Sequence, residues 1–177
     1  MKPSRRLFLT ALGLGSLPVW LAGCGFQLRQ NRDFAFKTLY ANFSITSPFG
    51  VELRRNLLGT GRIDLLTDPK QMLTSDAILD ILSEERQQVA VGVSATGQVR
   101  ELQLRLRVRF RLRTPQGVEL IEPVELFQQR DLSFTETAAL SKEIEQGILY
   151  RDMQTDIVQQ IMRRLSSLKP RNAPQPA

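Results

Sequence analysis

The chain has 177 residues, of which 42% are hydrophobic and 24% are charged, so it can form one globular domain and a short targeting segment. It contains no histidine and one cysteine, which excludes an intrachain disulfide and removes the commonest general base and metal ligand. The formal net charge is +6, but Lys2, Arg5 and Arg6 precede the cysteine with no acidic residue among them. The rest of the chain carries +3, which is too small a surplus to predict a nucleic-acid partner.

Residues 1–23 have the three parts of a secretory signal peptide. A positive segment is followed by the apolar residues 7–20 and by two small residues before Cys24. Glycine and proline interrupt the apolar part, which is too short for a transmembrane helix. Residues 21–24, Leu-Ala-Gly-Cys, match the lipobox of bacterial lipoprotein signals. We therefore predict cleavage before Cys24, with a diacylglycerol on its sulfur and an acyl chain on its amino group, and no other cofactor.

Two features near the cleavage site bear on where the protein goes and how it is exported. Gly25 follows the cysteine, at a position where aspartate would resemble an inner-membrane retention signal, so we predict sorting to the outer membrane. Residues 4–10, Ser-Arg-Arg-Leu-Phe-Leu-Thr, resemble a twin-arginine export motif. An ordinary positive segment that contains two arginines explains the same residues, and we favour the general secretory route.

The mature chain divides into three parts. Residues 24–33 are predicted to be a lipidated linker, residues 34–168 a single domain, and the proline-rich residues 169–177 a disordered tail. No internal repeat divides the domain further.

The first half of the domain predicts short elements. Residues 34–43 are aromatic and extended in character, which predicts a strand. Ser47 and Pro48 are typical of the start of a helix, and glycine at 59 or 61 is expected to end it. Residues 63–66 predict a short second strand.

Two long hairpins occupy the centre of the chain. Residues 77–93, 98–114 and 118–134 predict three strands, joined by a two-residue turn at 96–97 and a three-residue loop at 115–117. In the middle strand, apolar residues occupy every even position from 102 to 112, and arginine occupies every odd position from 105 to 113. This strict period of two predicts a strand with one buried face.

Residues 136–168 predict a long final helix. Apolar residues recur there at intervals of three and four, which places them on one stripe: Leu140, Ile144, Ile148, Leu149, Met153, Ile157, Ile161, Leu165 and Leu168. We interpret this stripe as core. Together the elements predict an α+β fold in which two helices cover one face of a mostly antiparallel sheet.

The arginine stripe of the middle strand has two interpretations. The expected loops place Glu119 and Asp80 opposite Arg113, so that acids lie on both sides of this arginine. They also place one acid beside each of two further arginines, in the pairs Glu125–Arg107 and Glu84–Arg109. A ladder of ion pairs therefore explains the stripe without a ligand.

Arg105 and Arg111 have no acidic residue directly opposite them in this register, so a site for an anion or a partner that uses these two arginines is the other interpretation. The same register places Ser83, Glu85 and Gln87 on the apolar face. Because polar side chains are unfavourable there, we expect a bulge or fraying in that stretch.

The sequence offers no arrangement typical of a catalytic site. It has no glycine-rich phosphate loop and no spacing of metal ligands. Asp64 with Asp68, and Glu84 with Glu85, form pairs of carboxylates, which we interpret as solvated charges. We therefore expect neither enzyme activity nor a metal site.

Residues 21–29, Leu-Ala-Gly-Cys-Gly-Phe-Gln-Leu-Arg, resemble the start of the LPS-assembly lipoproteins (LptE), which read LAGCGFxLRG. Gln30 stands where the family has glycine. Residues 142–146 and 162–165 resemble parts of the family's C-terminal helix. The order of the predicted elements also agrees with the family over nearly the whole chain.

This resemblance implies two helices packed on a four-stranded sheet, and no enzyme activity. It implies that the chain plugs the outer-membrane β-barrel LptD, assists the assembly of that barrel, and binds lipopolysaccharide during its insertion into the outer leaflet. The family binds lipopolysaccharide through basic residues near one end of the sheet, where Arg100 and Lys142 are candidates. Arg105 and Arg111 are further candidates. The alternative is a free lipoprotein that faces the periplasm and acts as an envelope-stress binding module or a hydrolase.

Overall fold

The computed structural model describes residues 34–134 and 139–168. The signal peptide, Cys24 and its linker, and the tail from residue 169 lie outside the described residues, so what the sequence predicts for them stays a prediction. Neither helix in the described part combines the length and the apolar character needed to cross a membrane.

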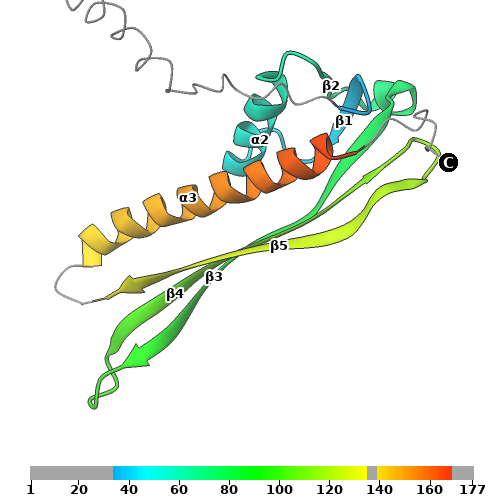
Figure 1. The fold of residues 1–177 in the computed structure, drawn as a ribbon. Helices are drawn as coiled ribbons and strands as arrows, with labels where there is room; N and C mark the ends of the chain where they lie inside the picture. Colours follow the sequence, from blue (N-terminus) through cyan, green and yellow to red (C-terminus); the bar gives the residue numbers. More distant parts are fainter. Residues whose placement is uncertain (1–33, 135–138, 169–177) are drawn as a thin grey trace, which may run out of the picture. The chain divides into compact units, whose positions relative to one another are not determined.

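The described residues form one sheet and two α-helices (Figure 1). The three long strands end within one residue of their predicted ends, because the alternating pattern identifies them clearly. In chain order the elements are β1 (Thr38–Asn42), α2 (Pro48–Leu58), β2 (Asp64–Leu66), the 3-10 helix η2 (Pro69–Thr74), β3 (Ala77–Val93), β4 (Val99–Arg113), β5 (Glu119–Ser133) and α3 (Ala139–Ser166).

The strands lie in the order β2-β1-β3-β4-β5. β1 is parallel to both β2 and β3, whereas β3, β4 and β5 form two antiparallel hairpins. The predicted α+β class is confirmed, but the four-stranded sheet that the resemblance implied is wrong. The short strand predicted at residues 63–66 forms at residues 64–66, pairs with β1 and makes a fifth strand at the edge of the sheet.

Helix α2 begins as predicted. The Ser47 side chain accepts a hydrogen bond from the Gly50 N–H at 3.0 Å, and Pro48 occupies the first turn, where no N–H is needed. The helix ends at Leu58, and Gly61 adopts a positive φ of 65° in the turn that follows. This turn leads the chain back to the sheet as β2.

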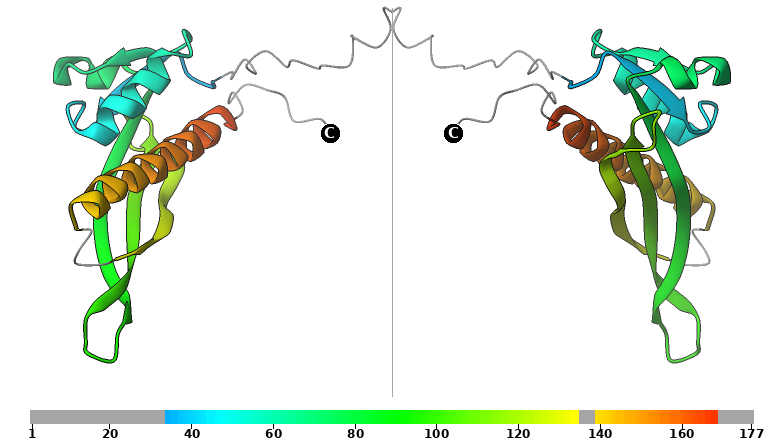
Figure 2. Two further views of the ribbon diagram at one scale, coloured as in Figure 1. Left: turned by 90° about the vertical axis from the view of Figure 1, so that its left-hand side faces the viewer. Right: turned by 90° about the vertical axis from the view of Figure 1, so that its right-hand side faces the viewer.

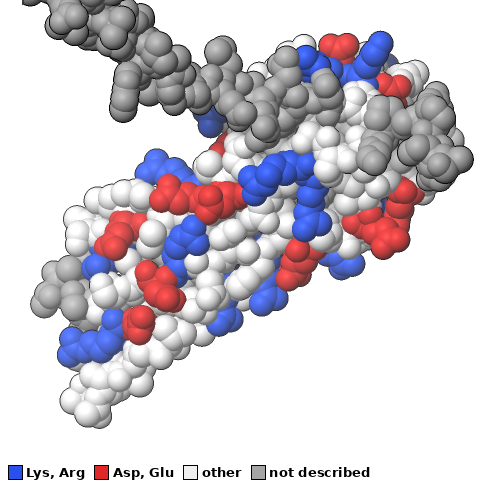
Figure 3. Space-filling model, viewed as in Figure 1, with Lys and Arg blue, Asp and Glu red and all other residues white. Residues whose placement is uncertain are grey.

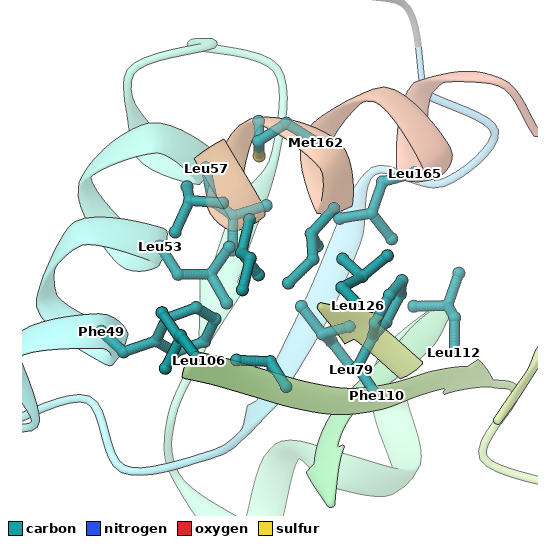
Figure 4. Packing of buried hydrophobic residues seen from close by; sticks show 14 of the residues in the cluster. Phe49, Leu53, Leu57, Leu79, Leu106, Phe110, Leu112, Leu126, Met162 and Leu165 are labelled. Atoms are coloured by element: carbon teal, nitrogen blue, oxygen red, sulfur yellow. The ribbon is translucent and has the colours of Figure 1, made fainter. Parts of the chain in front are cut away.

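The core lies between the two helices and one face of the sheet. All five even-numbered side chains of β4 from Leu104 to Leu112 are fully buried on this side. Figure 4 shows side chains from α2 and α3 packed above them, including Leu53, Leu57 and Leu165. Burying one such side chain stabilises the fold by about 1.5–3 kcal/mol. The prediction that the even positions of this strand form the core is therefore confirmed.

The first turns of α3 do not follow the prediction. Leu140, Ile144 and Ile148 are 76%, 63% and 45% exposed, so the apolar stripe is core only from about Leu149 onward. Lys142, in these turns, donates to the hydroxyl of Ser133 at the end of β5 at 3.3 Å. This contact with the sheet is polar, whereas the apolar contacts of α3 with the core begin farther along the helix.

Tyr150 connects α3 with β3. Its hydroxyl donates to the backbone carbonyl of Gln87 at 2.8 Å, and the guanidinium of Arg86 lies 5.4 Å from the centre of its ring. Burial raises the pKa of Tyr150, which keeps the hydroxyl protonated as a donor at neutral pH. This contact holds the helix against the middle of the long strand.

Asp76 connects the start of β1 with the start of β3, and its removal is expected to destabilise the fold. Its carboxylate accepts hydrogen bonds from the backbone N–H groups of Lys37 and Thr38, both at 2.9 Å. The bond from Thr38 does most to hold the pKa of Asp76 below its ordinary value, against the opposing effect of burial. At pH 7 we expect Asp76→Ala to lower the free energy of unfolding by about 1 kcal/mol.

Because the pKa of Asp76 is lowered in the folded chain, its contribution is present above the unfolded pKa and is lost as the pH falls through the folded pKa. Urea unfolding at pH 7 and at pH 3 should therefore show a smaller effect of Asp76→Ala at pH 3. The exposed Asp64→Ala serves as control. An effect of Asp76→Ala that is equal at both pH values would contradict this assignment.

Candidate functional site

The turn between β3 and β4 decides which side chains share a face of the sheet. Ser94 donates its N–H to the carbonyl of Gln98 at 2.8 Å, and Gly97 takes a positive φ of 80°. The loop therefore has three residues, 95–97, and not the predicted two. Because side chains alternate along a strand, this difference of one residue moves every side chain of the adjoining part of β3 to the opposite face.

The ion pairs predicted between β3 and β4 are changed accordingly. Glu84 lies opposite Val108 and not opposite Arg109, and Asp80 lies opposite Arg111 and not opposite Arg113. The predicted bulge is confirmed, as a register shift between Ile81 and Ser83. The bulge reverses which side of the sheet the odd-numbered side chains of β3 point to. The odd-numbered residues that precede the bulge therefore face the core, and Leu79 is fully buried there.

The β4–β5 hairpin also departs from the predicted register. Glu119 lies opposite Arg113 as predicted, but two register shifts follow between Arg113 and Phe110. Glu125 therefore lies opposite Arg109 and not opposite Arg107. Pro123, which has no N–H to give to the ladder, lies in the shifted stretch of β5.

The five odd-numbered arginines of β4 lie on the side of the sheet opposite the helices, which we call the arginine face: Arg105, Arg107, Arg109, Arg111 and Arg113. This surface falls into two parts with different chemistry. One part is an ion-pair cluster around Asp80, and the other is a row of three arginines without such a partner.

Asp80 is the centre of the ion-pair cluster. It is 2% exposed, and its carboxylate lies 2.7 Å from the Nε atoms of both Arg111 and Arg113. Burial alone would raise the pKa of Asp80, but hydrogen bonds from Arg113, Asn42 and Arg111 outweigh it and hold the pKa below its ordinary value. Arg111 also lies 3.8 Å from Glu119, so the prediction that it lacks an acidic partner is wrong.

The remaining three arginines, Arg105, Arg107 and Arg109, form what we call the open row. Within the described ranges none of them makes an ion pair, although Glu85 and Glu125 lie opposite Arg107 and Arg109 in the ladder. Arg105, which was predicted to lack an acid, donates its Nε to the side-chain oxygen of Gln103 at 2.8 Å. The prediction for Arg105 is thus confirmed.

Arg107 and Arg109 were not identified from the sequence, because the predicted register gave an acid to each of them. The guanidinium of Arg107 lies 5.4 Å from the ring centre of Phe127 on β5, and its buried Nε has no hydrogen-bond partner. Phe127, which is 43% exposed, was the sequence signal that could have indicated this site. An exposed aromatic residue beside arginines is typical of a binding surface.

The other two candidates lie near one end of the sheet. Lys142 donates to the Ser133 hydroxyl at 3.3 Å and pairs with Glu145 at 2.7 Å. Ser133 lies opposite Glu101, which follows Arg100. Arg111 is at the other end, beside Asp80, and Arg105 is between the two ends. The structure therefore does not bring the four predicted residues together into one site.

The open row can bind phosphate groups. Its guanidinium groups project from every second residue, so they repeat about every 6.6 Å along the strand. Guanidinium binds phosphate through two parallel hydrogen bonds, and each of these is stronger than a neutral one. The face that carries α3 shows interspersed charges of both signs (Figure 3).

A comparison with known families agrees with the arrangement of these elements. The family model of LptE, described as lipopolysaccharide-assembly, matches residues 36–165. The chain belongs to the LptE family. Its role therefore lies in lipopolysaccharide assembly.

Individual relatives support the LptE assignment. The chain is 28% identical over 166 residues to the LPS-assembly lipoprotein LptE of Pectobacterium atrosepticum, which covers 92% of this chain and 86% of that protein. The solution structure of lipoprotein B from Nitrosomonas europaea is 33% identical, with a TM-score of 0.67 over 81% of this chain and 91% of that one. A minor lipoprotein from Acinetobacter baumannii, 22% identical with a TM-score of 0.60 over 76% of this chain and 94% of that one, shares the fold.

Proposed function

We propose that the protein is an outer-membrane lipoprotein, exported by the general secretory route and anchored through lipids on Cys24. In this proposal it plugs the β-barrel LptD, assists the assembly of that barrel, and binds lipopolysaccharide during insertion into the outer leaflet. The observation that carries the proposal is the LptE family match over residues 36–165.

The dimensions of the sheet support a position inside a barrel. β3 has 17 residues, which at about 3.3 Å per residue extend roughly 55 Å. The hydrocarbon core of a bilayer is about 30 Å thick, so the strand is long enough to run the full height of a barrel wall. The arginine face is polar, and the interior of an outer-membrane barrel is polar too.

Recovery of the barrel with the tagged chain tests the proposal. We expect the full-length protein, extracted in mild detergent, to bring down LptD in a stable complex. Cys24→Ser should abolish labelling by fatty acid and weaken retention in the membrane fraction. Failure to recover any barrel protein with the unsubstituted chain would overturn the proposal.

Binding of lipopolysaccharide is expected to depend on the open row more than on the ion-pair cluster. Arg105→Glu places a negative charge in the row and should raise the dissociation constant about tenfold, which corresponds to about 1.4 kcal/mol. Arg113→Glu should change it about twofold or less, since Arg113 is already paired with Asp80. Equilibrium binding of purified lipopolysaccharide to the two variants measures the difference.

Stability should change in the opposite order. Arg113→Glu places an acid beside the buried Asp80 and should lower the melting temperature, whereas Arg105→Glu removes one hydrogen bond to Gln103. Arg105→Lys keeps the charge and should recover part of the binding. Equal losses of binding in Arg105→Glu and Arg113→Glu would show that the open row is not the site.

A further inference from the structure

The long strand β3 has a free edge over most of its length. β1 pairs with residues 77–80 only, and no strand in the part of the chain that the structure describes pairs with that edge beyond Asp80. Figure 2 shows the β3–β4 hairpin projecting past α3 and β5. The backbone N–H and C=O groups along this edge are therefore available to another strand.

The pairing of the strands identifies which residues of β3 face outward. Thr114 donates its N–H to the carbonyl of Val118, just before β5, and the side to which backbone groups point alternates along a strand, so the even-numbered residues of β4 face β5 and the odd-numbered ones face β3. Residues 85, 87 and 89 of β3 lie opposite odd-numbered residues of β4, so their N–H and C=O groups point toward β4. Residues 84, 86 and 88 therefore present their backbone groups outward.

From Gln87 onward the side chains along this edge do not protect it. Residues 87–99 contain no charged residue and no proline, and Val91 and Val93 are 48% and 64% exposed. The end of the hairpin is accordingly uncharged in Figure 3. The opposite edge of the sheet, on β5, carries Pro123 and several charges. Proline and charge are the usual protection of an edge strand, so the β3 edge is the one suited to a partner.

A hollow lies where β1 leaves this edge. It has a volume of about 270 Å³ and is lined by Phe43, Ser44, Ser47 and Phe49 on one side and by residues 81–84 of β3 on the other. Its walls include the aromatic rings of Phe43 and Phe49 and the aliphatic side chains of Ile81 and Leu82. The hollow therefore suits one apolar side chain of a strand that lies against β3 in line with β1.

We propose that an extended segment of the partner barrel adds to β3 along residues 83–90, and that it places one apolar side chain in the hollow. This inference rests on the proposed function, because the barrel is the partner. The segment would carry uncharged side chains opposite residues 87–90 and a basic one beside Glu84 or Glu85. Strand addition of this kind takes its affinity from main-chain hydrogen bonds and its specificity from side-chain pockets.

A single extended segment fits the edge better than a second copy of this chain. A second copy would present its β3–β4 hairpin, which is two strands wide and would meet the end of β1 at Asn42. A single strand instead continues the line of β1 past Phe43 and can use the whole edge. A single strand can also reach the hollow, whereas the hairpin of a second copy is stopped by the end of β1.

Hydrogen–deuterium exchange at single-residue resolution tests the proposal with the full-length chain, alone and in complex with the barrel. In the free chain the amides of Glu84, Arg86 and Gln88 should exchange quickly, whereas those of Glu85 and Gln87 are protected by β4. In the complex we expect the first three to exchange at least tenfold more slowly. Residues 126–132 of β5 serve as the internal control.

Substitution at the edge gives a second measurement. Gln88→Pro removes an outward N–H and leaves the ladder with β4 intact, so recovery of the barrel should fall about fivefold or more. Gln88→Thr keeps the N–H and an uncharged side chain and should behave like the unsubstituted protein. Melting temperatures of both variants show whether a loss of recovery reflects loss of folding.

The outcomes separate this inference from the proposed function. A complex that forms while the three amides stay unprotected would overturn strand addition and leave the proposed function standing. Absence of any complex would overturn both. Protection of these amides in the isolated chain would also overturn the inference. Protection that rises with protein concentration would assign the edge to a second copy of the chain. Protection that does not change with concentration would assign the edge to other residues of the same chain.

Discussion

Replacing Asp80 with alanine is expected to lower the free energy of unfolding by about 3 kcal/mol. The carboxylate is 2% exposed and holds two arginines, so its loss leaves Arg111 and Arg113 without their shared partner. Removing one member of a buried pair costs about 3–5 kcal/mol. The side chains of Arg111 and Arg113 are 34% and 20% exposed, so water can replace part of their lost hydrogen bonds to Asp80. Urea unfolding at pH 7 measures the effect.

Asp131 provides a matched control on the same face of the sheet. It is exposed and accepts a hydrogen bond from Gln103 at 3.0 Å. Because exposed substitutions usually change stability by no more than about 0.5 kcal/mol, Asp131→Ala should be close to neutral. Equal effects of Asp80→Ala and Asp131→Ala would show that the buried cluster does not stabilise the fold.

The contribution of Asp80 should also depend on pH. Its pKa is held below the ordinary value in the folded chain, so the unfolded chain takes up a proton first as the pH falls. The stabilisation is therefore fully present above about pH 5 and is lost below the unfolded value of 3.8, as the pH passes through the folded pKa. The stability difference between the unsubstituted protein and Asp80→Asn should shrink from pH 7 to pH 2.5. A constant difference would contradict the assignment.

The sequence was sufficient for the strands, since alternation is a property of each strand alone. Residues 104–112 place every second side chain in the core, and no tertiary contact is needed to recognise that pattern. The pairing of strands depends on the loops as well. Both hairpin loops contain three residues, and each ends in a glycine with positive φ, Gly97 in the first loop and Gly117 in the second. A three-residue loop was predicted only for the second hairpin.

This single difference explains most of the errors at the candidate site. The shorter loop placed Glu84 opposite Arg109 and Asp80 opposite Arg113, whereas these acids lie opposite Val108 and Arg111. Bulges near Leu82 and Pro123 then shift the pairing again. A bulge depends on the fit between two strands and a core, so the local pattern of residues indicates a conflict without showing how it is resolved.

The helix α3 shows a different limit. The spacing of its apolar residues predicts a stripe along its whole length, and the stripe exists, but only its second part packs into the core. Leu140 and Ile144 remain exposed, whereas Ile157 and Leu165 are fully buried. Periodicity identifies the face of a helix, and burial depends on what the rest of the fold places opposite that face.

Gly50→Ala is expected to destabilise the protein by about 2 kcal/mol. A Cβ at this position would lie 1.9 Å from the carbonyl oxygen of Ser44 and 2.9 Å from its carbon. These are backbone atoms, and Ser47 donates its N–H and its hydroxyl to the same oxygen. The substitution must therefore move the first turn of α2 away from the segment that precedes it, and with it Phe49, which is 1% exposed in the core. Overpacking of this kind costs about 1–3 kcal/mol.

The same substitution in α3 should have the opposite sign. Gly147 has nothing within 4 Å of the position of a Cβ and lies in the interior of the helix. Alanine is favoured over glycine in a helix by about 1 kcal/mol, so Gly147→Ala should raise the free energy of unfolding by about that amount. Since intrinsic helix propensity favours alanine at both positions, the difference of about 3 kcal/mol isolates the close approach of Ser44 to α2. Thermal unfolding of the two variants beside the unsubstituted protein measures it, and a gain at both positions would show that α2 can move without loss.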